Sequence, residues 1–309
     1  RVINESGLPV LAIDIPSGVE ADTGRVATDA VRAAATLALG LPKPGHFFAP
    51  GAACTGKLIV DGIGIPASLL AADSIQQDFL DEATAVGLLP VRPMDAHKGS
   101  CGRILVIAGS RGMTGAAVLA SEAVLRSGAG IATLAAAESL HDILEVKLTE
   151  VMTRPVPEIA PGVLGMTALS TLLELAADYD AVLLGPGLGR QEETMELVRQ
   201  FAAQTECPLI LDADAIYAFN GRGTELKNLK HIPILTPHLG EMASLLQLSV
   251  PELRESLVDM SREAAREYQA IFVVKSECTI VVYPEGPVFF TSHGNAGMAS
   301  AGCGDVLAG

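Results

Sequence analysis

The sequence predicts an α/β protein in which mainly parallel sheets carry helices on their faces. From Val10 onward, short apolar runs alternate with alanine-rich stretches of helical character. Polar and glycine-rich motifs follow the apolar runs, as expected of ligand loops at the carboxyl ends of parallel strands. A chain of 309 residues with 49% hydrophobic content is long enough for two such domains with separate cores.

The first domain is expected over residues 1–88. Its predicted strands are Val10–Ile15, Ala35–Leu41 and Lys57–Asp61. The boundary is placed at Leu89-Pro90-Val91-Arg92-Pro93, because the two prolines restrict the backbone and disfavour a helix. The second domain is then residues 89–309.

The second domain repeats the alternation from Arg103 onward. A proline- and glycine-containing turn at 284–287 is expected to join two of its strands as a hairpin. The predicted strands are Arg103–Ala108, Ile131–Ala136, Ala181–Gly185, Leu209–Asp212, Ile232–Thr236, Ile271–Lys275, Thr279–Tyr283 and Val288–Thr291. The predicted helices are Gly115–Ser127, Glu192–Ala203 and Pro251–Tyr268.

Composition argues against several classes of protein. Lysine and arginine number 21 against 36 aspartates and glutamates, a net charge of −15 that repels polyanions, so no nucleic-acid partner is expected. The five cysteines form no C-x-x-C pair, which argues against zinc and disulfides and favours a reducing, cytoplasmic setting. No apolar run reaches the roughly 18 residues that span a bilayer. We expect a homo-oligomer, since such sheet proteins often assemble.

The stretch from Gly294 to Gly309 is the most informative motif. Its glycines permit backbone N–H groups to approach a phosphate, and a helix that follows would direct its positive end at the same anion. Asp305 is placed to accept the proton of a substrate hydroxyl during phosphoryl transfer. Packing alone is the alternative explanation, since glycine-rich strand-to-helix turns are common.

Together with earlier motifs, this stretch resembles the ADP-dependent NAD(P)H-hydrate dehydratases of the ribokinase-like superfamily. The resemblance implies a ribokinase-like three-layer αβα domain that acts on hydrated NAD(P)H, the NAD(P)HX of repair metabolism, with ADP or ATP and Mg²⁺. The motifs are His97-Lys98-Gly99, Gly102–Ser110, Thr114-Gly115-Ala116-Ala117, Leu184-Gly185-Pro186-Gly187-Leu188-Gly189, Leu211-Asp212-Ala213-Asp214-Ala215 and Thr236-Pro237-His238-Leu239-Gly240-Glu241.

The resemblance implies roles for single residues. Asp305 is the expected base and a substrate contact, and Gly115, Gly187 and His238 are the other expected substrate contacts. A histidine that only bonds its own turn is the alternative for His238. Asp212 and Asp214 are left open: they orient substrate or hold a metal-bound water, or Asp214 caps the next helix.

The adenine nucleotide is expected along two segments. The family's lysine-glycine-x-x-threonine segment matches Lys275–Thr279 with serine in place of the glycine, and a positive φ there would cost about 1 kcal/mol. Cys303 stands where serine or threonine is usual, which should matter little if backbone amides hold the anion. The expected nucleotide-binding residues are Lys275, Ser276, Glu277, Cys278, Thr279, Asn295, Ala296, Gly297, Met298, Ala299, Ser300, Ala301, Gly302, Cys303 and Gly304.

The N-terminal part resembles the NAD(P)H-hydrate epimerases, through Val10–Gly18, Gly40–Gly45 and Asp61–Pro66. The resemblance implies that Asp14 contacts substrate and Ser17 binds a potassium ion. No glycine-rich phosphate loop precedes these motifs, so we expect the C-terminal remnant of a Rossmann-like αβα domain, inactive alone.

The same residues are compatible with more than one function. The expected reaction is phosphorylation of the C6 hydroxyl of hydrated NAD(P)H, followed by elimination of phosphate. A kinase for a small alcohol is one alternative, because the scaffold serves many hydroxyl substrates. A silent nucleotide-binding fragment is another: only Val306–Gly309 follow Asp305, the domain is expected to be truncated, and so short a tail is not expected to form a helix by itself. A Rossmann dehydrogenase fits less well, since no G-x-G-x-x-G is present.

Overall fold

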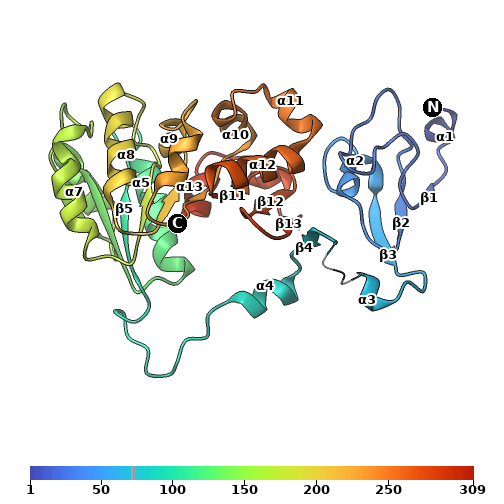
Figure 1. The fold of residues 1–309 in the computed structure, drawn as a ribbon, viewed down its shortest axis with the longest axis horizontal. Helices are drawn as coiled ribbons and strands as arrows, with labels where there is room; N and C mark the ends of the chain where they lie inside the picture. Colours follow the sequence, from blue (N-terminus) through green and yellow to red (C-terminus); the bar gives the residue numbers. More distant parts are fainter. Residues whose placement is uncertain (71, 73) are drawn as a thin grey trace.

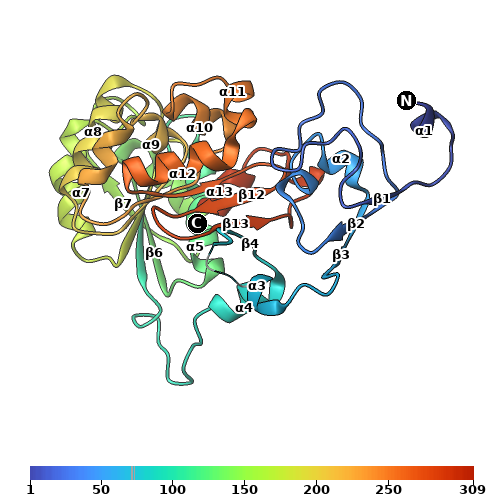
Figure 2. The ribbon, with the colours of Figure 1, turned by 45° about the vertical axis from the view of Figure 1, so that its right-hand side comes forward.

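The computed structural model describes residues 1–70, 72 and 74–309, arranged as two α/β units joined by an extended link (Figure 1). The smaller unit, drawn in blue, holds a three-stranded sheet, and the larger unit holds a ten-stranded sheet with helices packed on it. A turned view shows the link and the short helices α3 and α4 below both units (Figure 2). The predicted α/β class is confirmed.

The ten-stranded sheet has the order β4-β13-β12-β11-β10-β9-β8-β5-β6-β7. Its seven strands from β11 to β7 are parallel, whereas β12 pairs antiparallel with both β11 and β13. The bounds are β4 Gln77–Phe79, β5 Arg103–Ile107, β6 Ile131–Ala137, β7 Met152–Val156, β8 Ala181–Leu184, β9 Leu209–Leu211, β10 Ile234–Leu235, β11 Ile271–Val274, β12 Thr279–Val282 and β13 Val288–Thr291.

The winding direction of this sheet reverses between β5 and β8. The chain runs outward from β5 through β6 to β7, then returns to β8 on the other side of β5 and continues through β9 to β10. In open parallel sheets, ligands bind outside the carboxyl ends of the strands at such a reversal. The fold therefore directs attention to the loops that follow β5 and β8.

Helices pack in two groups around this sheet. One group joins α5, α6 and α13, and the other runs in sequence from α7 to α12 (Figure 1). Their bounds are α5 Thr114–Ser127, α6 His141–Lys147, α7 Leu169–Ala176, α8 Glu192–Gln204, α9 Asp214–Tyr217, α10 Leu239–Leu245, α11 Val250–Glu255, α12 Leu257–Tyr268 and α13 Cys303–Ala308. The core between the layers is apolar and includes the fully buried Phe201, Phe219 and Phe272.

Most predicted elements are present within one or two residues of their expected ends. The predicted helix Pro251–Tyr268 was wrong in one respect, because it is broken at Ser256 into α11 and α12, where the backbone leaves the helical region (φ −148°, ψ 49°). Strand β7 was not predicted. It contains Pro155, which a sheet tolerates at its edge, and β7 is the edge strand.

The terminal helix α13 forms, contrary to the expectation from its length. Six residues do not sustain a helix in isolation, but α13 packs along α5, where Ala308 is buried. The Ser127 hydroxyl of α5 also donates to the carbonyl oxygen of Gly309 at 2.9 Å. Tertiary contact therefore supplies the stability that the short segment lacks.

The smaller unit is a parallel sheet of β1 (Leu11–Ile13), β2 (Ala35–Leu39) and β3 (Lys57–Asp61), as predicted. Short helices α1 (Val2–Glu5) and α2 (Ala52–Thr55) belong to this unit, whereas α3 (Ala67–Leu70) and α4 (Glu82–Leu88) lie along the link (Figure 1). The domain boundary at residue 88 stays a prediction. Strand β4 precedes that boundary and is hydrogen-bonded to β13, so the large sheet includes a strand from the chain before it.

Substitutions at two glycines with positive φ test how closely β8 and β9 must approach each other. Gly185 follows β8 at φ +131°, and a Cβ there would lie 1.9 Å from the Asp212 carbonyl oxygen. Gly112 has φ +90° with open space around it. We expect Gly112→Ala to cost about 1 kcal/mol from backbone strain alone, and Gly185→Ala to cost clearly more because β8 and β9 must separate. Urea denaturation of both variants measures the difference, and equal losses would contradict the close approach.

Candidate active site

The expected substrate residues lie on loops at the carboxyl ends of neighbouring strands. Gly115 follows β5, Gly187 follows β8 and His238 follows β10. These strands are parallel and close to the winding reversal, so their loops open at one edge of the sheet. The fold therefore gathers residues that lie far apart in the sequence.

The loops after β5 and β8 are locked to each other. The amide of Gly109 donates to the Pro186 carbonyl oxygen at 2.8 Å. Gly187 has φ +65°, and a Cβ there would come within 3.0 Å of the Ala116 side chain. Gly115 lies in the first turn of α5, exposed, with no heavy atom within 4 Å of where its Cβ would stand. The first turn of α5 thus offers open space beside a tightly packed turn.

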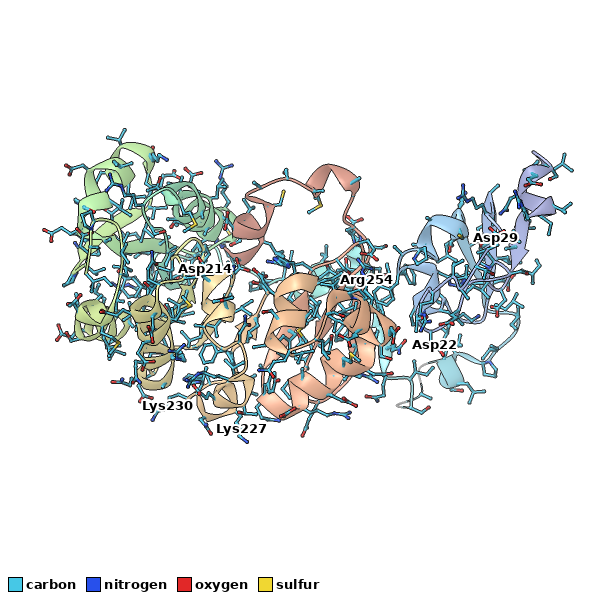
Figure 3. All side chains as sticks on the ribbon, turned by 90° about the horizontal axis from the view of Figure 1, so that it is seen from above. Asp22, Asp29, Asp214, Lys227, Lys230 and Arg254 are labelled. Carbon is cyan, nitrogen blue, oxygen red and sulfur yellow. The ribbon has the colours of Figure 1, made fainter. Side chains whose placement is uncertain are left out.

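Asp214 organises the turn after β8. One carboxylate oxygen accepts from the Gly189 amide at 2.9 Å, and the other accepts from the Arg190 side chain at 2.8 Å. Asp214 lies inside α9 rather than ahead of it, so the idea that it caps this helix was wrong. Arg190 also lies over the Tyr217 ring, 4.3 Å from its centroid. Figure 3 shows Asp214 inside the larger unit.

Asp212 is the most buried carboxylate of this edge, with 1% exposure. Its Oδ1 accepts a hydrogen bond from the Thr236 hydroxyl at 2.6 Å and another from the Lys275 ammonium at 2.9 Å. The Lys275 side chain is itself 19% exposed. A carboxylate buried this deeply needs such partners, because an unpaired buried charge is strongly destabilising. Three adjacent strands, β9, β10 and β11, supply the members of this arrangement.

Asp305 joins these residues from the end of the chain. Burial raises the pKa of its carboxyl group, and the negative charge of Asp212 raises it further, while Lys275 opposes both. The adjacent Gly304 lies so that a Cβ would stand 3.4 Å from Lys275 Nζ. Asp212, Thr236, Lys275 and Asp305 therefore form one group, called here the strand-end cluster.

His238 is placed by the helix that it begins. It is the N-cap of α10, and its Nδ1 accepts from the amides of Gly240 and Glu241 at 3.0 and 3.1 Å. This is the turn-bonding role that the sequence offered as the alternative for His238. It involves Nδ1 and not Nε2. Because Nδ1 accepts, the neutral ring carries its hydrogen on Nε2, which lies 3.4 Å from Glu241 on a side chain that is 60% exposed. The Nε2 of His238 thus faces the Glu241 carboxylate and is exposed enough to donate to a ligand.

The Lys275–Thr279 segment does not present all its side chains in one direction. Lys275 turns to Asp212, whereas Glu277 contacts Ala49 and Arg254. Cys278 is fully buried, and burial raises the pKa of its thiol to about 12, so the residue presents no exposed atom to a nucleotide. Ser276 is absent from the residues with positive φ, so the expected strain of about 1 kcal/mol does not arise. Thr279 begins β12 and is partly buried.

The segment from residue 294 to 300 is an exposed loop that arches away from the body of the larger unit before α13 (Figure 3). Asn295 caps its short 3-10 turn by accepting from the Gly297 amide at 2.9 Å. Gly302 then enters α13 with φ +92°, a backbone that favours glycine. The Ser300 hydroxyl and the Cys303 thiol lie 3.3 Å apart. The backbone of this turn thus reaches the strand-end cluster through Gly304.

The residues expected in the epimerase-like part lie in the smaller unit. The Asp14 carboxylate accepts from the Lys43 ammonium and from the Leu39 amide at 3.1 Å. The hydrogen bond from Lys43 is the main cause that lowers the pKa of Asp14. The Asp14 backbone has φ +67°, and its carbonyl oxygen lies 2.8 Å from His46 Nε2. Ser17 is exposed, and the potassium role stays a prediction.

Two absences concern only the residues that the structure describes. Among them, no group of three histidine, cysteine, aspartate or glutamate residues is arranged to hold a metal ion. In the same part of the chain, no helix is both long and apolar enough to cross a membrane.

A cavity of about 420 Å³ lies between the two units, and Ala49, Pro50 and Arg254 are among its lining residues.

The sequence did not identify the roles of Thr236 and Arg190. Thr236 is the first polar residue after the apolar run of β10, and that position was the available signal. Nothing in the sequence indicated that Lys275 would pair with Asp212, because 63 residues separate them. The pairing exists only because β9, β10 and β11 are neighbours in the sheet.

Comparisons with known proteins agree with this geometry. A model of the NAD(P)H-hydrate dehydratase family matches residues 104–309, and a model of the YjeF-related protein N-terminus matches residues 1–45. Bifunctional NAD(P)H-hydrate repair enzymes of Moorella thermoacetica and Thermofilum pendens are each 41% identical over the whole chain. The chain covers 58% of the length of each of these two relatives.

Solved structures give the same result for the fold. An ADP/ATP-dependent NAD(P)H-hydrate dehydratase from Bacillus subtilis, co-crystallised with ATP and Mg²⁺, is 29% identical with a TM-score of 0.61, covering 75% of this chain and 78% of that one. A ribokinase-like protein from Enterococcus faecalis is 27% identical with a TM-score of 0.64 and the same coverage. The chain thus belongs to the NAD(P)H-hydrate dehydratase family.

Proposed function

We propose that this chain dehydrates hydrated NAD(P)H to NAD(P)H at the expense of ADP or ATP. The observation that supports the proposal best is the strand-end cluster, in which Asp305 lies beside the buried pair of Asp212 and Lys275. The loops of Gly115, Gly187 and His238 open at the same edge of the sheet. A phosphoryl donor and a hydroxyl acceptor can therefore meet at Asp305.

In the proposed reaction, the terminal phosphoryl group passes from ADP or ATP to the C6 hydroxyl oxygen of the hydrated ring, and AMP or ADP leaves. Asp305 accepts the hydroxyl proton, and its raised pKa makes it a better base than an exposed aspartate. The lone pair of the ring nitrogen then expels phosphate from C6, and loss of a ring proton completes the double bond. Phosphate is a much better leaving group than hydroxide, so the protein mainly has to position and stabilise charge.

Lys275 and Asp212 would fix the electrostatics of that step. Lys275 is the cation of the cluster, and it donates to Asp212, which also accepts a hydrogen bond from the Thr236 hydroxyl. A positive charge held in a partly buried setting stabilises a transferring phosphoryl group. The amides of Gly302 to Asp305 would line the anion, as the resemblance implies.

The donor set fits a magnesium ion that is carried mainly by phosphates. Such an ion needs only one or two carboxylates, and Asp212 and Asp305 are the carboxylates of the cluster. Bound there, the ion would neutralise phosphate charge. ATP with Mg²⁺ in the Bacillus subtilis relative supports this assignment.

The smaller unit is proposed to be part of an NAD(P)H-hydrate epimerase module. The family match at residues 1–45 and the bifunctional relatives support this. Asp14 as a substrate contact and Ser17 as a potassium ligand remain predictions, as do a homo-oligomeric state and a cytoplasmic setting.

Asp305→Asn tests the base directly. The amide cannot accept the proton, so we expect dehydration of hydrated NADH with ADP or ATP to fall by about 10² or more. The measurement is recovery of reduced-nicotinamide absorbance with Mg²⁺ present. Nucleotide binding by the variant, followed by calorimetry, serves as the folding control. Undiminished turnover would remove Asp305 from the mechanism.

The pH profile tests the cause of the raised pKa of Asp305. The base acts only when ionised, so turnover falls as pH is lowered through this raised pKa. Asp212→Asn removes the neighbouring negative charge and frees Lys275, and both changes favour ionised Asp305. We expect the acidic limb of kcat/KM to move to lower pH. Asp214→Asn, two residues away, should leave the limb where it is, and a shift of both profiles would contradict the assignment.

His238 has a capping role and a proposed substrate role that two substitutions separate. Asparagine keeps the cap of α10, whereas alanine loses about 1 kcal/mol of stability with it. Both remove the Nε2 donor, so both should raise the KM for the hydrated dinucleotide by about tenfold, the worth of one hydrogen bond. Steady-state kinetics and thermal melting measure the two effects. An unchanged KM in His238→Asn would restrict His238 to capping.

A further inference from the structure

The loop from Lys275 to Thr279 reaches two different places in the molecule. At its first residue, the Lys275 ammonium contacts Asp212 in the strand-end cluster. Two residues later, Glu277 contacts the smaller unit and α11. Only Ser276 separates these two residues, so few backbone torsions lie between the two contacts. The junction of the two units is therefore mechanically close to the proposed active site.

Glu277 accepts hydrogen bonds from two separate parts of the chain. Its Oε1 accepts from the Ala49 amide at 2.9 Å and from Arg254 Nη1 at 2.8 Å, and its Oε2 accepts from Arg254 Nη2 at 3.3 Å. Ala49 belongs to the smaller unit, and Arg254 lies on α11. Figure 3 shows Arg254 on the side of the larger unit that faces the smaller one. The contacts fix the direction of the Glu277 carboxylate from two sides.

The charge state of Glu277 suits this role. Burial raises the pKa of its carboxyl group, but the hydrogen bonds from Arg254 and Ala49 outweigh burial and lower the pKa overall. The Glu277 side chain is 31% exposed and the Arg254 side chain 40%, so their ion pair contributes little to global stability. Its effect is therefore expected on the position of the loop and not on whether the protein folds.

Other contacts hold the two units together beside Glu277. Phe47 stacks on Phe79 with ring centroids 5.1 Å apart, and Phe48 lies 5.8 Å from Phe290. Strand β4 of the large sheet also fixes the chain that leaves the smaller unit to β13. Because these contacts do not involve Glu277, a substitution there should loosen the loop while the units stay docked.

We propose that Glu277 is a positioning residue that couples the docking of the smaller unit to nucleotide binding through the Lys275–Thr279 loop. The inference rests on the proposed function for the identity of the nucleotide, ADP or ATP. It makes the Ala49 amide a remote reporter of nucleotide binding. By thermodynamic reciprocity, a nucleotide that is favoured by the anchored loop must in turn favour the Ala49 contact.

The first experiment compares Glu277→Ala with Glu263→Ala, which removes the same charge from an exposed position on α12. We expect the KM for ATP, and the calorimetric Kd for ATP with Mg²⁺, to rise three- to tenfold in Glu277→Ala. The kcat should stay within twofold, and neither constant should change in Glu263→Ala. Glu277→Gln keeps an acceptor for Ala49 and should fall between the two. Unchanged affinity in a folded Glu277→Ala protein would overturn the proposal.

The second experiment measures hydrogen exchange at Ala49. We expect ATP with Mg²⁺ to slow exchange in wild type at least threefold, and to leave it unchanged in Glu277→Ala. An ATP effect of equal size in both proteins would overturn the coupling. If wild type binds ATP but performs no dehydration, the proposed function fails while both experiments still decide the inference. If wild type binds no nucleotide, both proposals fail.

Discussion

The buried carboxylate of Asp212 is the constraint on which the active edge of the sheet depends. It is almost completely withdrawn from water, and it is held by a hydroxyl from one neighbouring strand and an ammonium from the next. Removing one partner of such a buried pair typically costs about 3–5 kcal/mol. The strands β9, β10 and β11 must therefore stay in register at their carboxyl ends. That requirement also fixes where Lys275 stands relative to the rest of the cluster.

The turn that precedes α13 packs against this cluster. Its small residues permit the backbone to pass close to Lys275, and α13 then rests on α5. Gly115 lies in the first turn of α5, so the same helix carries this proposed substrate contact and supports the turn of Asp305. Asp305 thereby becomes half-buried next to a like charge, which gives it greater basicity than an aspartate in water. Packing and chemistry are served by the same contacts.

The two units of the chain are connected by more than the link between them. Two aromatic contacts and the contact of Glu277 with Ala49 join the smaller unit to the β13 side of the large sheet, and the edge strand β4 fixes the link to the same side. This side includes β11, whose loop enters the strand-end cluster. These contacts connect the smaller unit physically to the part of the large sheet that carries Lys275.

The sequence by itself determined the α/β class, most of the strands and the identity of the chemically important motifs. Continuous apolar runs predict strands of a parallel sheet, because both faces of such a sheet are buried. The motif from Gly302 to Asp305 is likewise recognisable from its own residues. Only the tertiary structure decided which motifs meet. The pairing of Asp212 with Lys275, the use of Asp214 to hold Gly189 and the helix at the chain terminus all depend on neighbours distant in sequence. Local propensity carries no information about such neighbours, since strand order and helix packing create them.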